Sequence, residues 1–153
     1  EQFVTLIPGG YDRDLINDLL ECMANSHADF TLTFYHLSDA LADSTANDQA
    51  IRDLFDKPET FDEWAERWRD RLITEPADDV ERQTQMHAVN PLYIPRNHLV
   101  EAVIRAAEDK QDFQPFYELL DVLKQPYTEQ AGKEAFTTPP KPEEVVQNTF
   151  CGT

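Results

Sequence analysis

Two thiols are the side chains of the 153-residue chain best suited to covalent chemistry, Cys22 and Cys151. Cys22 lies beside an apolar stripe of helical spacing, so we expect it to be a small core-facing residue, as free cysteines usually are. Cys151 stands third from the end, on a segment with no apolar period that could bury it. An exposed thiol can exchange with a partner sulfur. From these residues alone, a redox role and an unreactive tail cysteine are equally good interpretations of Cys151.

The histidines and glycines do not assemble another candidate site. His27 and His36 are nine residues apart with no further ligand at a helical offset, so we interpret each as a hydrogen-bonded histidine. Gly9 and Gly10 stand alone and cannot build a phosphate loop. Neither the catalytic-loop motif nor the metal-binding motif of kinases occurs in the sequence. We therefore assign no catalytic, nucleotide-binding or metal-binding residue and expect the chain alone to be inactive.

Arg96, Asn97 and His98 could be read as a phosphate-handling cluster, but their context favours a structural role. Asn90-Pro91 begins a turn, because the proline disfavours the helical conformation of Asn90. Pro95 suits the first turn of the helix that follows. We expect Asn97 and His98 to bond to local backbone there, and Arg96 to pair with a carboxylate of a neighbouring helix.

These residues must be positioned by helices, since apolar residues recur at three- and four-residue steps along most of the chain. We expect helices over residues 11–25, 28–42, 49–55, 78–89 and 112–124. A further helix, capped by Thr60 or Asp62, reaches Ile73, and another follows Pro95. From residue 125 the chain is rich in proline and lacks a period. The sequence thus predicts an all-α fold, an irregular bundle of six or seven helices over residues 1–124 with an extended tail over 125–153.

Periodicity also predicts which side chains face inward. Phe30 and Phe34 fall on the expected buried face of the second helix. Trp64 and Trp68 are one turn apart, so both rings share a face that is a core or a docking surface, with packing the preferred interpretation. Glu66 and Arg71 belong to a charged outer face of small energetic value.

Composition excludes several classes of partner. Thirteen basic against thirty acidic residues give a net charge of −17, which repels nucleic acid and anionic membranes. No apolar run has the length of a membrane-spanning helix. Two cysteines are too few for a disulfide framework or a cysteine-built zinc site, and they fit a cytoplasmic protein. The chain starts without Met or a leader, so we expect a processed product or an excised fragment.

Three stretches in order resemble the carboxy-terminal region of the SelO/YdiU family: NPLYIPRNHLVEAVIRAAE, FYELLDVLKQPYTEQ and the terminal TFCGT. The resemblance implies a pseudokinase with a protein-kinase-like fold that acts as a protein adenylyltransferase. Such an enzyme transfers AMP from ATP to Ser, Thr or Tyr hydroxyls of bacterial proteins. The resemblance also implies that ATP and Mg²⁺ or Mn²⁺ are held by an upstream kinase-like domain, so that this chain contains no cofactor site.

The resemblance also implies roles for Cys151 and for two of the helical regions. The position matching Cys151 carries selenocysteine or cysteine in the family, which implies a redox residue able to form a disulfide with the catalytic part. The chain would pack on the kinase-like domain through the Trp64/Trp68 face or the helices over 99–123. The alternative is a non-catalytic helical module that binds a protein partner through its acidic surface.

Overall fold

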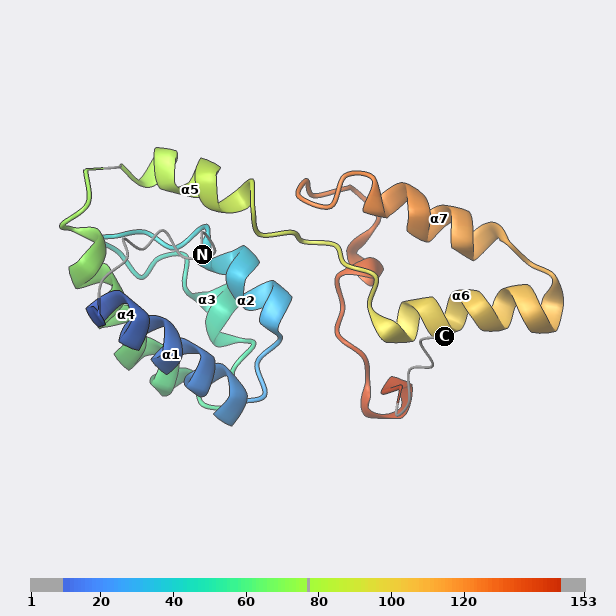
Figure 1. Ribbon diagram of the computed structural model, residues 1–153, viewed down its shortest axis with the longest axis horizontal. Helices are drawn as coiled ribbons and strands as arrows, with labels where there is room; N and C mark the ends of the chain where they lie inside the picture. Colours follow the sequence, from blue (N-terminus) through green and yellow to red (C-terminus); the bar gives the residue numbers. More distant parts are fainter. Residues whose placement is uncertain (1–9, 77, 147–153) are drawn as a thin grey trace. The chain divides into compact units, whose positions relative to one another are not determined.

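The computed structural model describes residues 10–76 and 78–146, and these form seven α-helices and two short 3-10 helices (Figure 1). No strand occurs in the described residues, so the all-α prediction is confirmed for them. The chain divides into two compact units, Glu1–Pro91 and Leu92–Thr153, called unit 1 and unit 2 here. This division lies before the boundary at residue 124 that the sequence suggested.

Unit 1 contains five helices packed around one core. They are α1 (Gly10–Asn25), α2 (Phe30–Leu37), α3 (Gln49–Arg52), α4 (Pro58–Leu72) and α5 (Asp79–His87). Helix α1 packs along α4, and α2 packs against α3 (Figure 1). The core is made by the apolar sides of these helices: Leu15, Leu19, Met23, Phe34, Leu37, Ala40, Ile51, Phe55, Phe61, Trp64, Ala65, Trp68, Leu72 and Met86.

Local capping sets where the helices begin, and it corrects two expectations. Asp29 accepts a hydrogen bond from the Leu32 amide at 2.8 Å, so α2 begins at Phe30 and ends at Leu37, shorter than the predicted 28–42. Phe30 is 55% exposed rather than buried. Helix α4 begins at Pro58, because the first turn of a helix needs no amide hydrogen and therefore tolerates proline. Lys57 occupies the capping position, so neither Thr60 nor Asp62 is the cap of this helix.

The tryptophan pair lies in the core of unit 1. The side chains of Trp64 and Trp68 are 1% and 0% exposed, and their rings stack at 5.5 Å with an interplanar angle of 16°. The indole N–H of Trp64 donates to the Leu15 carbonyl at 2.8 Å, which fixes α4 on α1. The packing interpretation is therefore correct, and this face is not a surface on which another domain could dock.

Arginines of α4 form ion pairs that the sequence pattern did not predict. The side chain of Arg71, expected on the outer face, is only 13% exposed and donates to Asp12 of α1 at 2.8 Å. Arg69 donates to Asp48 at 2.6 Å and to the Leu41 carbonyl at 2.9 Å. Because these groups are largely removed from water, losing one partner would leave a buried charge uncompensated.

Unit 2 contains α6 (Asn97–Lys110) and α7 (Gln114–Leu123), which lie side by side (Figure 1). Between them Gln111 adopts a left-handed conformation with φ 52° and ψ 30°. The Asp112 amide then returns to the Ala106 carbonyl at 3.0 Å, a common way to end a helix. The tail adds η1 (Glu134–Phe136) and η2 (Pro142–Glu144).

The first part of the tail is fixed to the start of unit 2. The Pro126 carbonyl accepts hydrogen bonds from the amides of Leu92 and Tyr93, at 2.8 and 3.1 Å. The Gln130 amide donates to the Tyr93 hydroxyl at 3.0 Å, and its side chain donates to the Val122 carbonyl at 2.9 Å. The tail is therefore a structural part of unit 2 as far as Gln130. Among the described residues, no helix combines the length and the apolar character needed to cross a bilayer.

Candidate functional site

The turn that begins at Asn90 contains most of the residues for which the sequence predicted a structural role. The division between the two units falls within this turn, after Pro91. Asn90 ends unit 1 as a buried residue whose side-chain amide donates to Ser38 Oγ at 3.2 Å. Its backbone N–H donates to the Met86 carbonyl at 2.9 Å. Asn90 thus ties the end of α5 to the end of α2, and Pro91 follows it as the last residue of the unit. This is a structural role, as the sequence suggested for Asn90.

The helix start that follows Pro95 differs from the expectation. Helix α6 begins at Asn97, so Pro95 precedes the helix and Arg96 occupies the capping position. Arg96 is buried, and its backbone N–H donates to the Ile94 carbonyl at 2.8 Å. The Asn97 side chain is exposed and makes no hydrogen bond with the described part of the chain. His98 keeps its Nδ1 buried without a partner, so the expected local network at Asn97 and His98 is absent.

A polar cavity of about 460 Å³ is lined by residues of α1 and α4 and of the segments that follow α1 and precede α4. Its lining combines both signs of charge with small polar groups: Asp18, Glu21, Cys22, Asn25, Ser26, Lys57, Thr60 and Arg67. The Cys22 thiol donates to the Thr60 carbonyl at 3.8 Å, and Arg67 donates to Asp18 at 2.7 Å. Arg67 is therefore paired with a carboxylate of the same lining.

Burial raises the pKa of the Cys22 thiol, and the opposing effect of Arg67 does not offset it. Asp18 and Glu21 add to the increase, because negative charges disfavour the thiolate. The thiolate is the reactive form of cysteine, so this environment makes Cys22 a poor nucleophile. Its partial burial against the unit 1 core agrees with the packing role expected from the sequence.

The histidines of unit 1 bind to acidic or aromatic neighbours. His27 Nδ1 lies 2.9 Å from Asp56, and His87 Nε2 lies 2.8 Å from Asp39. The ring of His36 packs edge-on against Tyr35 at 5.4 Å. Within residues 10–76 and 78–146, no three His, Cys, Asp or Glu side chains converge as metal ligands would.

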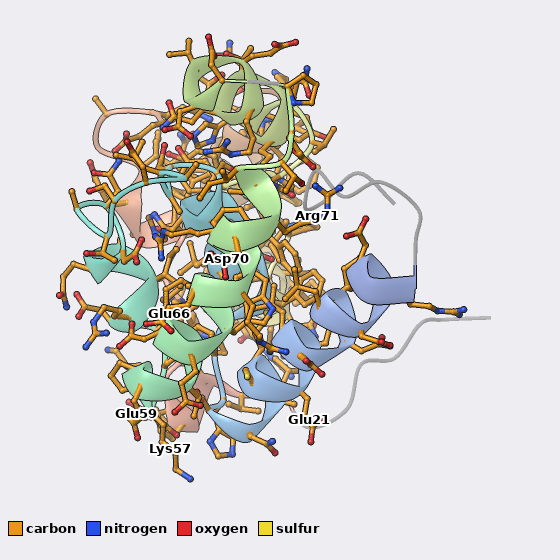
Figure 2. The ribbon with its side chains drawn as sticks, turned by 90° about the vertical axis from the view of Figure 1, so that its left-hand side faces the viewer. Glu21, Lys57, Glu59, Glu66, Asp70 and Arg71 are labelled. Carbon is orange, nitrogen blue, oxygen red and sulfur yellow. The ribbon has the colours of Figure 1, made fainter. Side chains whose placement is uncertain are left out.

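The outward side of α4 carries exposed carboxylates. Figure 2 shows Glu59, Glu66 and Asp70 placed along this helix, and all three side chains are exposed. Exposed carboxylates of this kind are solvated charges on the outward side of a surface helix. Cys151, the one residue for which a redox role was expected, lies outside the described residues.

Comparisons with known proteins relate the chain to one family. The profile of the family described as "Protein adenylyltransferase SelO" matches residues 6–124. A protein of Rhodopseudomonas palustris named "Protein nucleotidyltransferase YdiU" is 56% identical over 142 residues, which cover 93% of this chain and 29% of that protein. A protein of the same name from Bradyrhizobium diazoefficiens is 54% identical over 142 residues, 93% of this chain and 28% of that protein. The chain therefore spans less than a third of the length of these curated relatives.

Proposed function

Because this chain belongs to the SelO family of nucleotidyltransferases, we propose that it is the carboxy-terminal helical region of a protein adenylyltransferase. The activity would reside in a protein-kinase-like domain that precedes it in the full-length protein, in the bacterial cytoplasm. The observation that carries the proposal is the 56% identity to a named nucleotidyltransferase over 93% of the chain. Identity of that extent supports a common role for this region in both proteins.

The full-length protein would transfer AMP from ATP to Ser, Thr or Tyr hydroxyls of other proteins. ATP would supply the adenylyl group and release pyrophosphate, and residues of the kinase-like domain would hold ATP and the Mg²⁺ or Mn²⁺. The cavity beside Cys22 is a poor nucleotide site, because Asp18 and Glu21 would repel phosphates and Arg67 is already paired. We therefore assign the nucleotide to the part of the protein outside this chain.

The residues of this chain would act as a scaffold. The buried hydrogen bonds of Asn90 and of the Pro126 carbonyl fix the ends of the segment between α5 and α6. Within each unit, these contacts would hold the helices in place for the kinase-like domain. Cys151 would add a redox-sensitive residue to the tail, able to form a disulfide with that domain.

Labelled ATP tests the proposal directly. The full-length protein is incubated with Mg²⁺ and a mixture of candidate proteins, with ATP labelled either at the α- or at the γ-phosphate. We expect protein-bound label from α-labelled ATP only, because AMP retains the α-phosphate. Label from γ-labelled ATP alone would indicate kinase activity instead. The absence of any transfer would favour the alternative, a non-catalytic acidic helical module that binds a protein.

The chain of 153 residues serves as the matched control in a binding measurement. We expect it to bind ATP–Mg²⁺ far more weakly than the full-length protein in isothermal titration calorimetry. Tight binding by the chain alone would mean that the nucleotide site lies within it, and the assignment to an upstream domain would be wrong.

A further inference from the structure

Helix α7 carries apolar side chains on two opposite sides. Pro115, Leu119 and Val122 face the interior of unit 2, where Leu119 and Val122 are buried. On the other side, Phe113, Phe116, Tyr117 and Leu120 are spaced by three and four residues, so they form one stripe. We call these four side chains the outer face of α7. Their exposed fractions are 55%, 46%, 57% and 43%.

An outer face of this kind is unusual for a helix on a protein surface. A surface helix normally has one apolar stripe, and a helix that is apolar on opposite sides is normally covered on both. Single exposed apolar residues need no explanation, but four adjacent large ones, three of them aromatic, form a patch typical of an interface. The rings of Phe116 and Tyr117 contact each other edge-on, with their centroids 5.5 Å apart, so the middle of the stripe is one aromatic surface.

We propose that the outer face of α7 binds the part of the full-length protein that lies outside this chain. The proposal rests on the proposed function, since that function places a kinase-like domain in the same polypeptide. The relatives are more than three times as long as the segment they share with this chain, so most of their length is available to cover the face. The family profile extends to residue 124 and includes the whole outer face.

A second copy of the chain is the less favourable occupant. Each copy has a net charge of −17, so two copies repel each other at ordinary ionic strength. A domain of the same polypeptide is instead held at an effective concentration in the millimolar range by its connection. The borders of the face carry exposed Asp112 and Glu118. The surface that covers it should thus be apolar at its centre, with basic residues opposite these two carboxylates.

Side-chain footprinting of the wild-type full-length protein tests the proposal without a mutation. Hydroxyl-radical oxidation of Phe116 and Tyr117 is measured by mass spectrometry in the native and in the urea-denatured protein. We expect both residues to be protected to the same degree as Tyr93, which is buried in unit 2. Oxidation of both at rates close to the denatured state would overturn the proposal. Sedimentation measures whether the protein forms dimers under the same conditions. Protection that appears only when dimers form would also overturn the proposal, because a second copy would then cover the face.

A double variant provides an independent measurement. Phe116→Asp with Leu120→Asp in the full-length protein should lower Tm by more than about 5 °C, because the charges would enter a covered interface. Val80→Asp is the matched control, since Val80 is 72% exposed on α5 of unit 1. It should change Tm by less than about 2 °C, as exposed substitutions do. A double variant as stable as this control would contradict the docking.

The two proposals fail in different ways. Transfer of α-label by a wild-type protein whose outer face is unprotected would overturn the docking and leave the proposed function intact. A protected outer face in a protein that transfers no label would support the docking to the rest of the chain and remove the proposed function.

Discussion

At the scale of single residues, Trp64 and Trp68 are both buried but differ in the hydrogen bonding of the indole N–H. The indole N–H of Trp64 donates to Leu15, whereas that of Trp68 has no hydrogen-bond partner among the residues that the structure describes. We expect Trp64→Phe to lower the free energy of unfolding by about 1 kcal/mol more than Trp68→Phe, because only the first substitution removes a hydrogen bond. Both variants lose the same volume, so each is the control for the other. Urea denaturation followed by far-UV circular dichroism measures the difference, and equal losses would contradict it.

The buried carboxyl of Glu75 should make stability depend on pH. Burial raises its pKa, an effect that the opposing charges of Arg71 and Arg82 reduce but do not cancel. A raised pKa means that the folded state disfavours the ionised form, so this contribution to stability is lost as pH rises through the folded pKa. Glu75→Gln should therefore raise Tm relative to the wild type at pH 7. The difference should disappear when pH falls below the ordinary carboxyl range, where both side chains are neutral. Glu66→Gln, at an exposed position, should have no effect at either pH, and the same result for Glu75→Gln would contradict this account.

The two cysteines should respond differently to oxidation. In the full-length protein, Cys151→Ser should abolish a mobility shift that reducing agents reverse on electrophoresis, because a disulfide to the catalytic part would be lost. Cys22→Ser should leave the shift unchanged, since the Cys22 thiol is half-buried and its pKa is raised. A shift that survives Cys151→Ser would remove the redox role.

At the scale of elements, the end of α6 offers a stabilising substitution. Gln111 has a left-handed conformation, which costs a side chain more than it costs glycine. Gln111→Gly should raise the free energy of unfolding by about 0.5–1 kcal/mol. The neighbouring Lys110→Gly should lower it by a similar amount, because Lys110 is helical. Thermal unfolding distinguishes the two, and destabilisation by Gln111→Gly would mean that its side chain has an unrecognised role.

The helices could be predicted from the sequence, because their apolar period is local information. The ends of the helices could not be predicted in the same way, because they depend on particular residues. Asp29 caps α2, and α4 begins at Pro58. Arg71 was placed on the wrong side, since its partner Asp12 lies 59 residues away on α1. Asn97 and His98 were expected in a network that the structure does not contain. Sequence spacing cannot show such distant pairings, and the cavity beside Cys22 depends on them as well.

At the scale of the whole molecule, the tail completes unit 2 rather than following it. A chain that ends at Lys124 would lose the Pro126 carbonyl and leave the buried Leu92 and Tyr93 amides without an acceptor. Each unpaired buried amide costs about 1–3 kcal/mol. We therefore expect faster hydrogen exchange in α6 and α7 of this chain, with the core of unit 1 unchanged. A chain that ends at Gln130 keeps these contacts and is the control, and equal exchange in both chains would contradict the role of the tail.

The parallel stacking of the two indoles has an optical consequence for the whole molecule. Rings 5.5 Å apart with an interplanar angle of 16° are close enough for their excited states to couple. If the transition dipoles of the two rings are skewed to each other, such coupling produces paired bands of opposite sign in a dichroism spectrum, and the bands vanish once the rings separate. Both tryptophans of this chain belong to unit 1, so the paired bands would report on that unit alone. Light could thus follow the opening of this core in the 153-residue chain without an added label.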